Sequence, residues 1–233
     1  ANPCGVSIGD DLVETYQNAF KADSVSAFGG IVAINRKCTE ELAKILKDIF
    51  IEIVVAPSFE KEALKILSTK KNLRLLEVLD IENQDRKYEI RNLNGGILVQ
   101  QENNDILKID ELKVVTNTKP TEDSIKSMLF GWQVLKHVKS NAIITVKDNT
   151  TVGIGAGQVS RIDAVDIAIS KSKAAIKGSI LCSDAFFPFR DSIDKISQYN
   201  INGVIQPGGS IKDNEVIDAC NEHNIPMVFT GRR

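Results

Sequence analysis

The chain has 233 residues, of which 26% are charged, and its basic and acidic side chains almost cancel to a formal net charge of -2. This balance excludes a broad nucleic-acid-binding face, and we expect neither nucleic-acid nor membrane partners. No run approaches the roughly 18 apolar residues of a membrane span, and no signal-peptide pattern is present. The sequence therefore predicts a cytoplasmic protein with one large or two smaller domains.

The cysteines and histidines do not form the patterns of a metal site. Zinc deaminases need H-x-E and P-C-x-x-C, and neither pattern occurs. We therefore predict free thiols, with no disulfide framework and no structural zinc. The residues concerned are Cys4, Cys38, Cys182, Cys220, His137 and His223.

The first half of the chain alternates amphipathic segments with short apolar runs. One such run, 51–56, contains the carboxylate Glu52, which either faces water or contacts a ligand. The polar stretch 81–89 is predicted as a loop. The predicted helices are 11–22, 39–50 and 59–67, and the predicted strands are 28–35, 51–56, 73–78, 96–100 and 112–116.

The second half repeats the alternation more regularly. The Thr and Pro residues at 118–121 end the first part and cap a long helix, which places a domain boundary there. Regular alternation predicts parallel strand pairing with helices on both faces of the sheet. The predicted helices are 121–138, 160–177, 193–199 and 213–223, and the predicted strands are 142–146, 180–182, 203–205 and 227–230.

Three polar segments interrupt these apolar runs. They are the glycine segment 153–161, the aromatic segment 183–191 and the Pro-Gly-Gly segment 206–210. Glycine lets a backbone turn tightly and approach a ligand closely. Since loops that follow parallel strands gather at one edge of a sheet, these segments predict a ligand site at that edge.

A dinucleotide site is an alternative for the glycine segment, with Asp184 as the ribose-binding acid. The spacing is G-x-G-x-G, whereas the dinucleotide fingerprint is G-x-G-x-x-G. Arg161 also stands where the fingerprint has a residue for close helix packing. The spacing therefore disfavours this alternative.

Five further segments accompany the three polar segments, namely NPCG (2–5), SAFGG (26–30), AP (56–57), KSNA (139–142) and FTGRR (229–233). With these segments the chain resembles, from Ala1 to Arg233, the transformylase domain of the bifunctional purine-biosynthesis family. That family joins phosphoribosylaminoimidazolecarboxamide (AICAR) formyltransferase to inosine monophosphate (IMP) cyclohydrolase. The resemblance implies two cytidine-deaminase-like three-layer α/β/α units with mostly parallel, mixed sheets and no zinc site, covering 1–117 and 118–233.

The resemblance also implies a reaction. A formyl group passes from the cosubstrate 10-formyltetrahydrofolate to the 5-amino group of AICAR, in a homodimer with the site at the subunit interface. In the family a Lys-His pair, whose His transfers the proton, directly precedes the NPCG segment, and this sequence begins after it. A catalytically incomplete nucleotide-binding or dimerisation module is therefore the alternative to an active transformylase.

Site residues follow by matching the family's motifs. The resemblance implies a catalytic role for Asn141, as a donor to the developing oxyanion. From the residues alone, Asn141 also suits a turn, Phe186 suits the core, and Arg161 suits an ion pair with Asp191. His137 and His223 match no site position. The implied nucleotide contacts are Gly29, Glu52, Asn141, Phe186 and Arg233, and the implied folate contacts are Arg161, Asp191 and Ser210.

Overall fold

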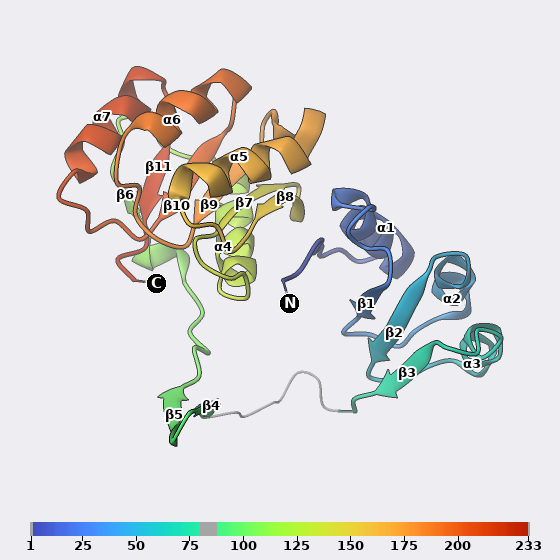
Figure 1. Ribbon diagram of the computed structural model, residues 1–233. Helices are drawn as coiled ribbons and strands as arrows, with labels where there is room; N and C mark the ends of the chain where they lie inside the picture. Colours follow the sequence, from blue (N-terminus) through green and yellow to red (C-terminus); the bar gives the residue numbers. More distant parts are fainter. Residues whose placement is uncertain (1, 80–87, 233) are drawn as a thin grey trace. The chain divides into compact units, whose positions relative to one another are not determined.

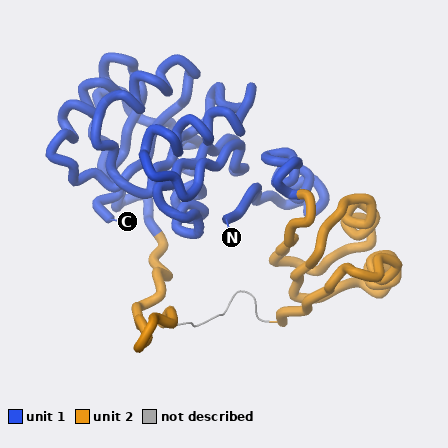
Figure 2. The backbone as a smooth tube through the Cα atoms, in the orientation of Figure 1, with its two compact units in different colours: residues 1–27, 107–233 blue, residues 28–106 orange. Residues whose placement is uncertain are grey.

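A computed structural model describes residues 2–79 and 88–232 and divides the chain into two compact units (Figure 2). Unit 1 comprises residues 1–27 and 107–233, and unit 2 comprises residues 28–106. The first residues of the chain thus belong to unit 1, the next form unit 2, and the remaining residues complete unit 1. The predicted division at 117/118 into two deaminase-like units stays a prediction.

Unit 1 is built on a six-stranded sheet with the order β6-β11-β10-β9-β7-β8 (Figure 1). Apolar and β-branched residues fill the central strands, as expected where both faces are covered. The strands are β6 (Lys113–Val114), β7 (Ile143–Lys147), β8 (Thr150–Gly155), β9 (Ile180–Ser183), β10 (Gly203–Gln206) and β11 (Met227–Phe229).

The sheet is mixed, as the resemblance implied, although the alternation of helices and strands by itself indicated parallel pairing. Strands β9, β10 and β11 are parallel, but β7 is antiparallel to both β8 and β9, and β6 is antiparallel to β11. The reason at β7 and β8 is the turn between them, where Asp148 and Asn149 have φ of 49° and 55°. Two residues with positive φ make a tight hairpin, which only antiparallel strands can use.

Helices cover both faces of this sheet. Helices α5 (Arg161–Ser172), α6 (Asp191–Ile196) and α7 (Asp213–Glu222) pack on one face, and α4 (Glu122–Leu135) packs on the other (Figure 1). Helix α1 (Leu12–Ala22) lies against β8. The three-residue to four-residue 3-10 helices are η1 (Ile109–Glu111), η2 (Lys173–Ile176) and η3 (Ser197–Tyr199).

Helix α5 begins directly after its capping residue, Ser160, and packs close to β8. The hydroxyl of Ser160 accepts the backbone N–H of Asp163 at 3.1 Å. Gly153 and Gly155, predicted to lie in a loop, are residues of β8. A Cβ on Gly153 would lie 2.1 Å from the carbonyl oxygen of Ala168, so these glycines allow α5 to approach the strand.

Unit 2 contains a three-stranded parallel sheet of β1 (Gly30–Ala33), β2 (Ile51–Ala56) and β3 (Arg74–Glu77). Helices α2 (Glu40–Lys47) and α3 (Lys61–Leu67) supply Leu42, Leu46 and Leu67 to its core, which is closed to solvent. These bounds agree with the predicted elements to within a few residues.

A hairpin of β4 (Tyr88–Leu93) and β5 (Gly96–Gln101) also belongs to the residues of unit 2. Strand β4 was not predicted. Tyr88 and Glu89 fall in the stretch predicted as a loop, and the rest of that stretch, 81–87, lies outside the described residues. The cause is composition, since Glu89, Arg91 and Asn92 interrupt the apolar pattern that indicates a strand.

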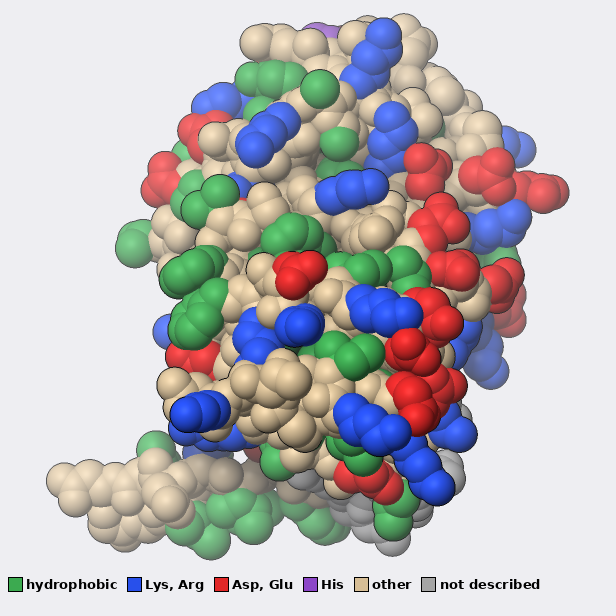
Figure 3. All heavy atoms as spheres, turned by 90° about the vertical axis from the view of Figure 1, so that its right-hand side faces the viewer, with side chains coloured by type: hydrophobic (Ala, Val, Ile, Leu, Met, Phe, Trp, Pro, Cys, Tyr) green, Lys and Arg blue, Asp and Glu red, His purple; other side chains and the backbone are tan. Residues whose placement is uncertain are grey.

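The surface has mixed character. On the face shown in Figure 3, basic, acidic and apolar side chains lie next to one another. In residues 2–79 and 88–232, no helix is both long and apolar enough to cross a membrane.

Candidate functional site

The three polar segments meet at one edge of the sheet in unit 1. The parallel strands β9 and β10 both end there, and they lead into the aromatic and Pro-Gly-Gly segments. Strand β7 starts at the same edge because Ile143 pairs with Ser183, and β8 ends there because Gly155 pairs with Ile143. Parallel pairing brings the aromatic and Pro-Gly-Gly segments together as expected, whereas the glycine segment reaches this edge through the antiparallel hairpin of β7 and β8.

Arg161 is the centre of a polar network at this edge. Its side chain is only 6% exposed, and its Nη1 donates to the carboxylate of Asp184. The same nitrogen donates to the carbonyl of Ala142 at 2.9 Å, and Nη2 donates to Oδ1 of Asn141 at 2.9 Å. Asp184 also accepts the backbone N–H of Ala142 at 2.9 Å. The network thus joins the start of β7, the start of α5 and the end of β9.

Asn141 is held in one orientation by this network. An arginine only donates, so the side-chain oxygen of Asn141 must face Arg161. Its Nδ2 then donates to the carbonyls of Gln158 and Val159, at 2.8 and 3.0 Å. Both amide protons are therefore engaged by the distant glycine segment, and not by the local backbone that the turn interpretation of Asn141 expected.

The predicted folate contacts are separate side chains at the same edge. Arg161 pairs with Asp184 rather than with Asp191, which corrects the ion-pair alternative. Asp191 is exposed at the start of α6 and accepts the N–H of Ser192 at 2.7 Å. The hydroxyl of Ser210 accepts the N–H of Lys212 at 3.1 Å.

The aromatic segment divides its side chains between core and surface. Phe187 is fully buried and belongs to the core, whereas the predicted contact Phe186 is half-buried. The backbone N–H of Phe187 donates to Oε1 of Gln206 at 3.1 Å. Gln206 is itself fully buried and ties the aromatic segment to the Pro-Gly-Gly segment. Sequence analysis missed this role, although a glutamine ending an apolar strand is a signal for it.

Exposed apolar side chains lie in the glycine segment, in the aromatic segment and directly after the Pro-Gly-Gly segment. Val159 is 98% exposed, Ile211 is fully exposed and Phe189 is half exposed. The ammonium of Lys212 lies 4.5 Å from the centre of the Phe189 ring, which connects the aromatic segment to the residues that follow the Pro-Gly-Gly segment. These apolar tips were not predicted as site residues.

The segment after β11 reaches the same edge. Arg232 donates through Nη1 and Nη2 to the two carboxylate oxygens of Glu111, at 2.8 and 2.9 Å. The hydrogen bonds from Arg232 hold the pKa of Glu111 below its usual value. Arg233, the predicted phosphate contact, lies outside the described residues.

The two remaining predicted residues belong to unit 2. Gly29 has φ of 71°, and its N–H donates to the carbonyl of Phe50 at 2.9 Å. A Cβ there would lie 3.3 Å from the Phe50 ring, so glycine suits both the conformation and the space. Glu52 is exposed on β2.

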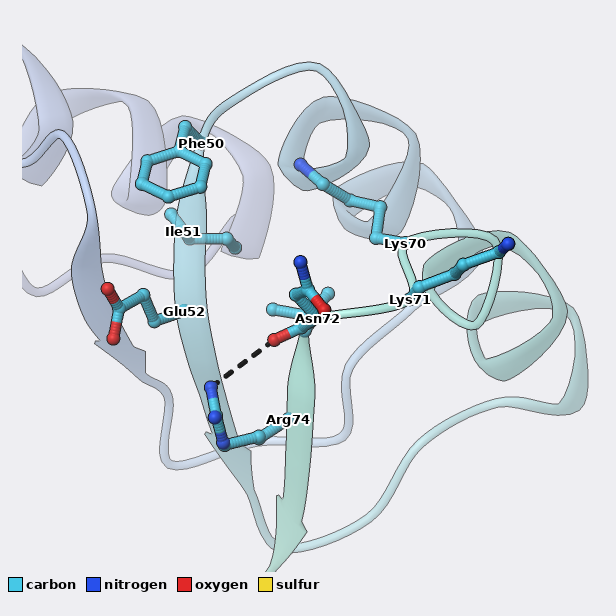
Figure 4. A pocket seen from close by; sticks show the side chains of 8 residues that line it. Phe50, Ile51, Glu52, Lys70, Lys71, Asn72 and Arg74 are labelled. Carbon is cyan, nitrogen blue, oxygen red and sulfur yellow. Dashed lines mark hydrogen bonds between the residues drawn. The ribbon is translucent and has the colours of Figure 1, made fainter.

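A cavity of about 520 Å³ adjoins Glu52 at the start of β2 and β3. Figure 4 shows the Glu52 carboxylate on the side of β2 away from Lys70, Lys71 and Asn72. The ammonium of Lys70 donates to the carbonyls of Lys47 and Ile49, at 2.8 and 2.5 Å. Lys70 therefore stabilises the end of α2.

The described residues contain no group of three or more His, Cys, Asp and Glu side chains that could hold a metal ion. Burial raises the pKa of Cys38 to about 11 and that of Cys220 to about 12, and it also raises the pKa of Cys182. These thiols stay protonated at neutral pH and are poor nucleophiles.

Comparison with known proteins identifies relatives over the whole chain. Residues 1–171 match the model of the AICARFT/IMPCHase bienzyme family. The bifunctional purine biosynthesis protein PurH of Caldicellulosiruptor saccharolyticus is 51% identical over 232 residues, which cover 100% of this chain and 45% of that protein. PurH of Aquifex aeolicus is 48% identical, with 100% and 46% covered, and PurH of Clostridium perfringens is 51% identical, with 99% and 45% covered.

The match to a solved structure named "Structural genomics, protein ybgI, unknown function" covers 87% of this chain and 72% of that chain. The two are 9% identical, with a TM-score of 0.20. The chain spans about half the length of the curated relatives that it matches. A family match over more than half of the chain, together with identities near 50%, establishes that this chain belongs to the AICARFT/IMPCHase bienzyme family.

Proposed function

We propose that this chain carries the formyl-transfer half of a bifunctional enzyme of de novo purine biosynthesis. It would move the formyl group of 10-formyltetrahydrofolate to the 5-amino group of AICAR. Membership of the family supports this reaction, and the relatives named PurH support the pathway. We further propose two cytidine-deaminase-like units and a homodimer with the site at the subunit interface. Cyclisation to IMP would belong to a domain outside these residues.

The buried guanidinium of Arg161 is the observation that carries the proposal. Three of its contacts are satisfied by Asn141, Ala142 and Asp184, but Nε is buried with no hydrogen-bond partner among the described residues. An unpaired buried N–H costs about 1–3 kcal/mol. Proteins rarely leave a buried polar group unpaired except where function requires it, and Arg161 is one of the predicted folate contacts.

The chemistry requires a stabilised tetrahedral intermediate. The amine of AICAR is a weak nucleophile because its lone pair is delocalised into the imidazole and carboxamide. Asn141 would donate one N–H to the developing oxyanion. Its bond to the Val159 carbonyl is the longer and more exposed of its two, so water can replace it at low cost when the substrate arrives.

Other contacts follow the predicted sets. We assign the nucleotide to Gly29, Glu52, Asn141, Phe186 and Arg233. We assign the folate to Arg161, Asp191 and Ser210. Asp191 is an exposed carboxylate and Phe186 is a half-buried ring, so both side chains are available for contact with a ligand.

The direct test is to incubate the purified chain with AICAR and 10-formyltetrahydrofolate and to follow tetrahydrofolate release by absorbance. Release that depends on AICAR supports the proposal, and Arg161→Lys should raise the KM for the folate about tenfold or more. The matched control Lys126→Gln, on an exposed ion pair of α4, should leave KM unchanged. AICAR binding without any release would instead favour the nucleotide-binding module.

A further inference from the structure

A second cavity lies in unit 1 at the edge of the sheet opposite the candidate site. It measures about 450 Å³ and opens between the end of α1, the turn joining β7 and β8, and the end of α5. Helix α5 runs from Arg161 to Ser172, so the two places are roughly 16 Å apart along the helix. No predicted site residue lines this cavity.

The lining is strongly basic. Four lysines face one carboxylate, and the lysines come from α1, from the end of β7 and from the end of α5. Lysines at the end of a helix can compensate the helix dipole, but only two of the four lysines stand at the end of α5. The dipole of α5 therefore does not account for all four. The charged lining residues are Lys21, Lys147, Lys171, Lys173 and Asp148.

Two of these lysines are held in place. Lys171 donates to the carboxylate of Asp23 at 2.6 Å and to the hydroxyl of Ser26 at 3.2 Å. Burial raises the pKa of Asp23, but hydrogen bonds from Lys171 and Ser26 outweigh burial and leave that pKa below its usual value. Lys147 donates to the carbonyl of Lys177 at 3.0 Å. An ammonium has three N–H groups, so both lysines can donate further while already immobilised.

The other two lysines lack such compensation. Lys21 and Lys173 are exposed, and neither forms an ion pair with another residue in the described ranges. Lys173 has φ of 51°, a conformation that non-glycine residues rarely adopt. Asp23 compensates the charge of Lys171, so three other ammonium groups share the single lining carboxylate Asp148, and a bound anion would offset their mutual repulsion.

We propose that this cavity binds a small phosphorylated anion. Lysine binds phosphate as a point charge, and the volume is in the range of small-molecule sites. The lining contains neither an aromatic ring nor an arginine, so it offers no stacking surface for a nucleobase and no bidentate fork for a carboxylate. A phosphorylated sugar and inorganic pyrophosphate share the chemistry that the lysines recognise.

The test is calorimetric titration of the full chain with inorganic phosphate, pyrophosphate, ribose 5-phosphate and triglutamate at fixed ionic strength. The double variant K21Q/K173N removes two of the four cations, and asparagine is among the residues found at the positive-φ position of a type II′ turn, which the φ of 51° and ψ of -133° at 173 resemble. Lys113→Gln combined with Lys126→Gln is the control, because it changes the net charge equally on β6 and α4. Both replaced lysines of the test variant are exposed, and circular dichroism will verify that it folds.

We expect pyrophosphate or ribose 5-phosphate to bind, the K21Q/K173N variant to weaken binding at least about tenfold, and the control to change it less than about twofold. A preference for ribose 5-phosphate over pyrophosphate would indicate a sugar phosphate as the ligand, and the reverse a free polyphosphate. Three results would overturn the proposal. The first is that neither pyrophosphate nor ribose 5-phosphate binds at 10 mM, which corresponds to roughly -2.7 kcal/mol. The others are that the control variant loses as much affinity as K21Q/K173N, or that triglutamate binds as tightly as the phosphorylated ligands. None of these readouts depends on formyl transfer.

Discussion

At the scale of single residues, the contact between Arg161 and Asp184 determines the geometry of the candidate site. Asp184 accepts from Arg161 and from the backbone N–H of Ala142, so one carboxylate fixes both the guanidinium and the start of β7. Arg161 in turn fixes the amide of Asn141. Asp184 is therefore a positioning residue for two predicted ligand contacts.

Replacing this carboxylate should be costly. Asp184→Asn leaves a buried guanidinium without its counter-charge, and we expect the free energy of unfolding to fall by about 3 kcal/mol. Urea unfolding followed by circular dichroism measures this change. In the folded variant, the side-chain amide protons of Asn141 should exchange faster with solvent, as seen by NMR, because Arg161 no longer holds the carboxamide.

The control is Asp163→Asn, an exposed carboxylate in the first turn of the same helix. It should cost less than about 1 kcal/mol, because it removes only a helix-dipole interaction. If the two variants lost equal stability, Asp184 would not have the positioning role described.

At the scale of elements, the close approach of β8 and α5 leaves no room for a side chain on the strand glycines. A Cβ on Gly155 would lie 2.0 Å from the carbonyl oxygen of Ala164, which is backbone and cannot move aside. Gly155→Ala should therefore destabilise the chain by about 3 kcal/mol in urea unfolding. Gly96→Ala is the control and should be nearly neutral, since a Cβ there meets no atom within 4 Å.

Helices α6 and α7 are joined by an exposed charge network. Hydrogen bonds from Arg190 and then from His223 hold the pKa of Asp194 at about 2, against an ordinary value of 3.8. A carboxyl whose folded pKa is depressed stabilises the fold above its unfolded pKa, and this contribution disappears as the pH falls through the folded value. The side chain is 40% exposed, so the contribution is about 1 kcal/mol or less.

Asp194→Asn should accordingly unfold at lower urea concentration than the unmodified chain at pH 7, and the difference should shrink as the pH falls from about 4 to about 2. Urea titrations across this range provide the measurement. Asp218→Asn removes the same charge from an exposed position of α7 and is the matched control. A constant gap between Asp194→Asn and the unmodified chain at all pH values would contradict the argument.

Local patterns predicted the elements well where apolar periodicity or a cap was present. Strand β2 was predicted with its observed bounds, and Ser160 marked the start of α5. The antiparallel hairpin of β7 and β8 was not predicted, because its turn uses Asp148 and Asn149 rather than a glycine. The partner of Arg161 was also not predictable, since contacts between distant segments depend on strand register.

At the scale of the whole molecule, the chain forms a discontinuous unit. The N-terminal segment is bound to unit 1 by specific contacts: Val6 donates its N–H to Thr151 at 2.9 Å, and Lys139 donates its N–H to Asn2 at 2.8 Å. Unit 2 has its own buried core around Leu42 and Leu46. The stability of residues 2–27 should therefore follow unit 1, although unit 2 is their neighbour in sequence.

Leu46→Ala tests this organisation. Removing a fully buried leucine should cost about 2–5 kcal/mol, and this loss should be confined to the core of unit 2. Hydrogen exchange measured by mass spectrometry should then accelerate within 28–79 but stay unchanged in α1 and in β7 to β11. Ile205→Ala, in the core of unit 1, should have the opposite effect and accelerate exchange in residues 2–27 as well. Acceleration of residues 2–27 in Leu46→Ala would mean that the N-terminal segment depends on unit 2, because local opening spreads only through cooperative contacts.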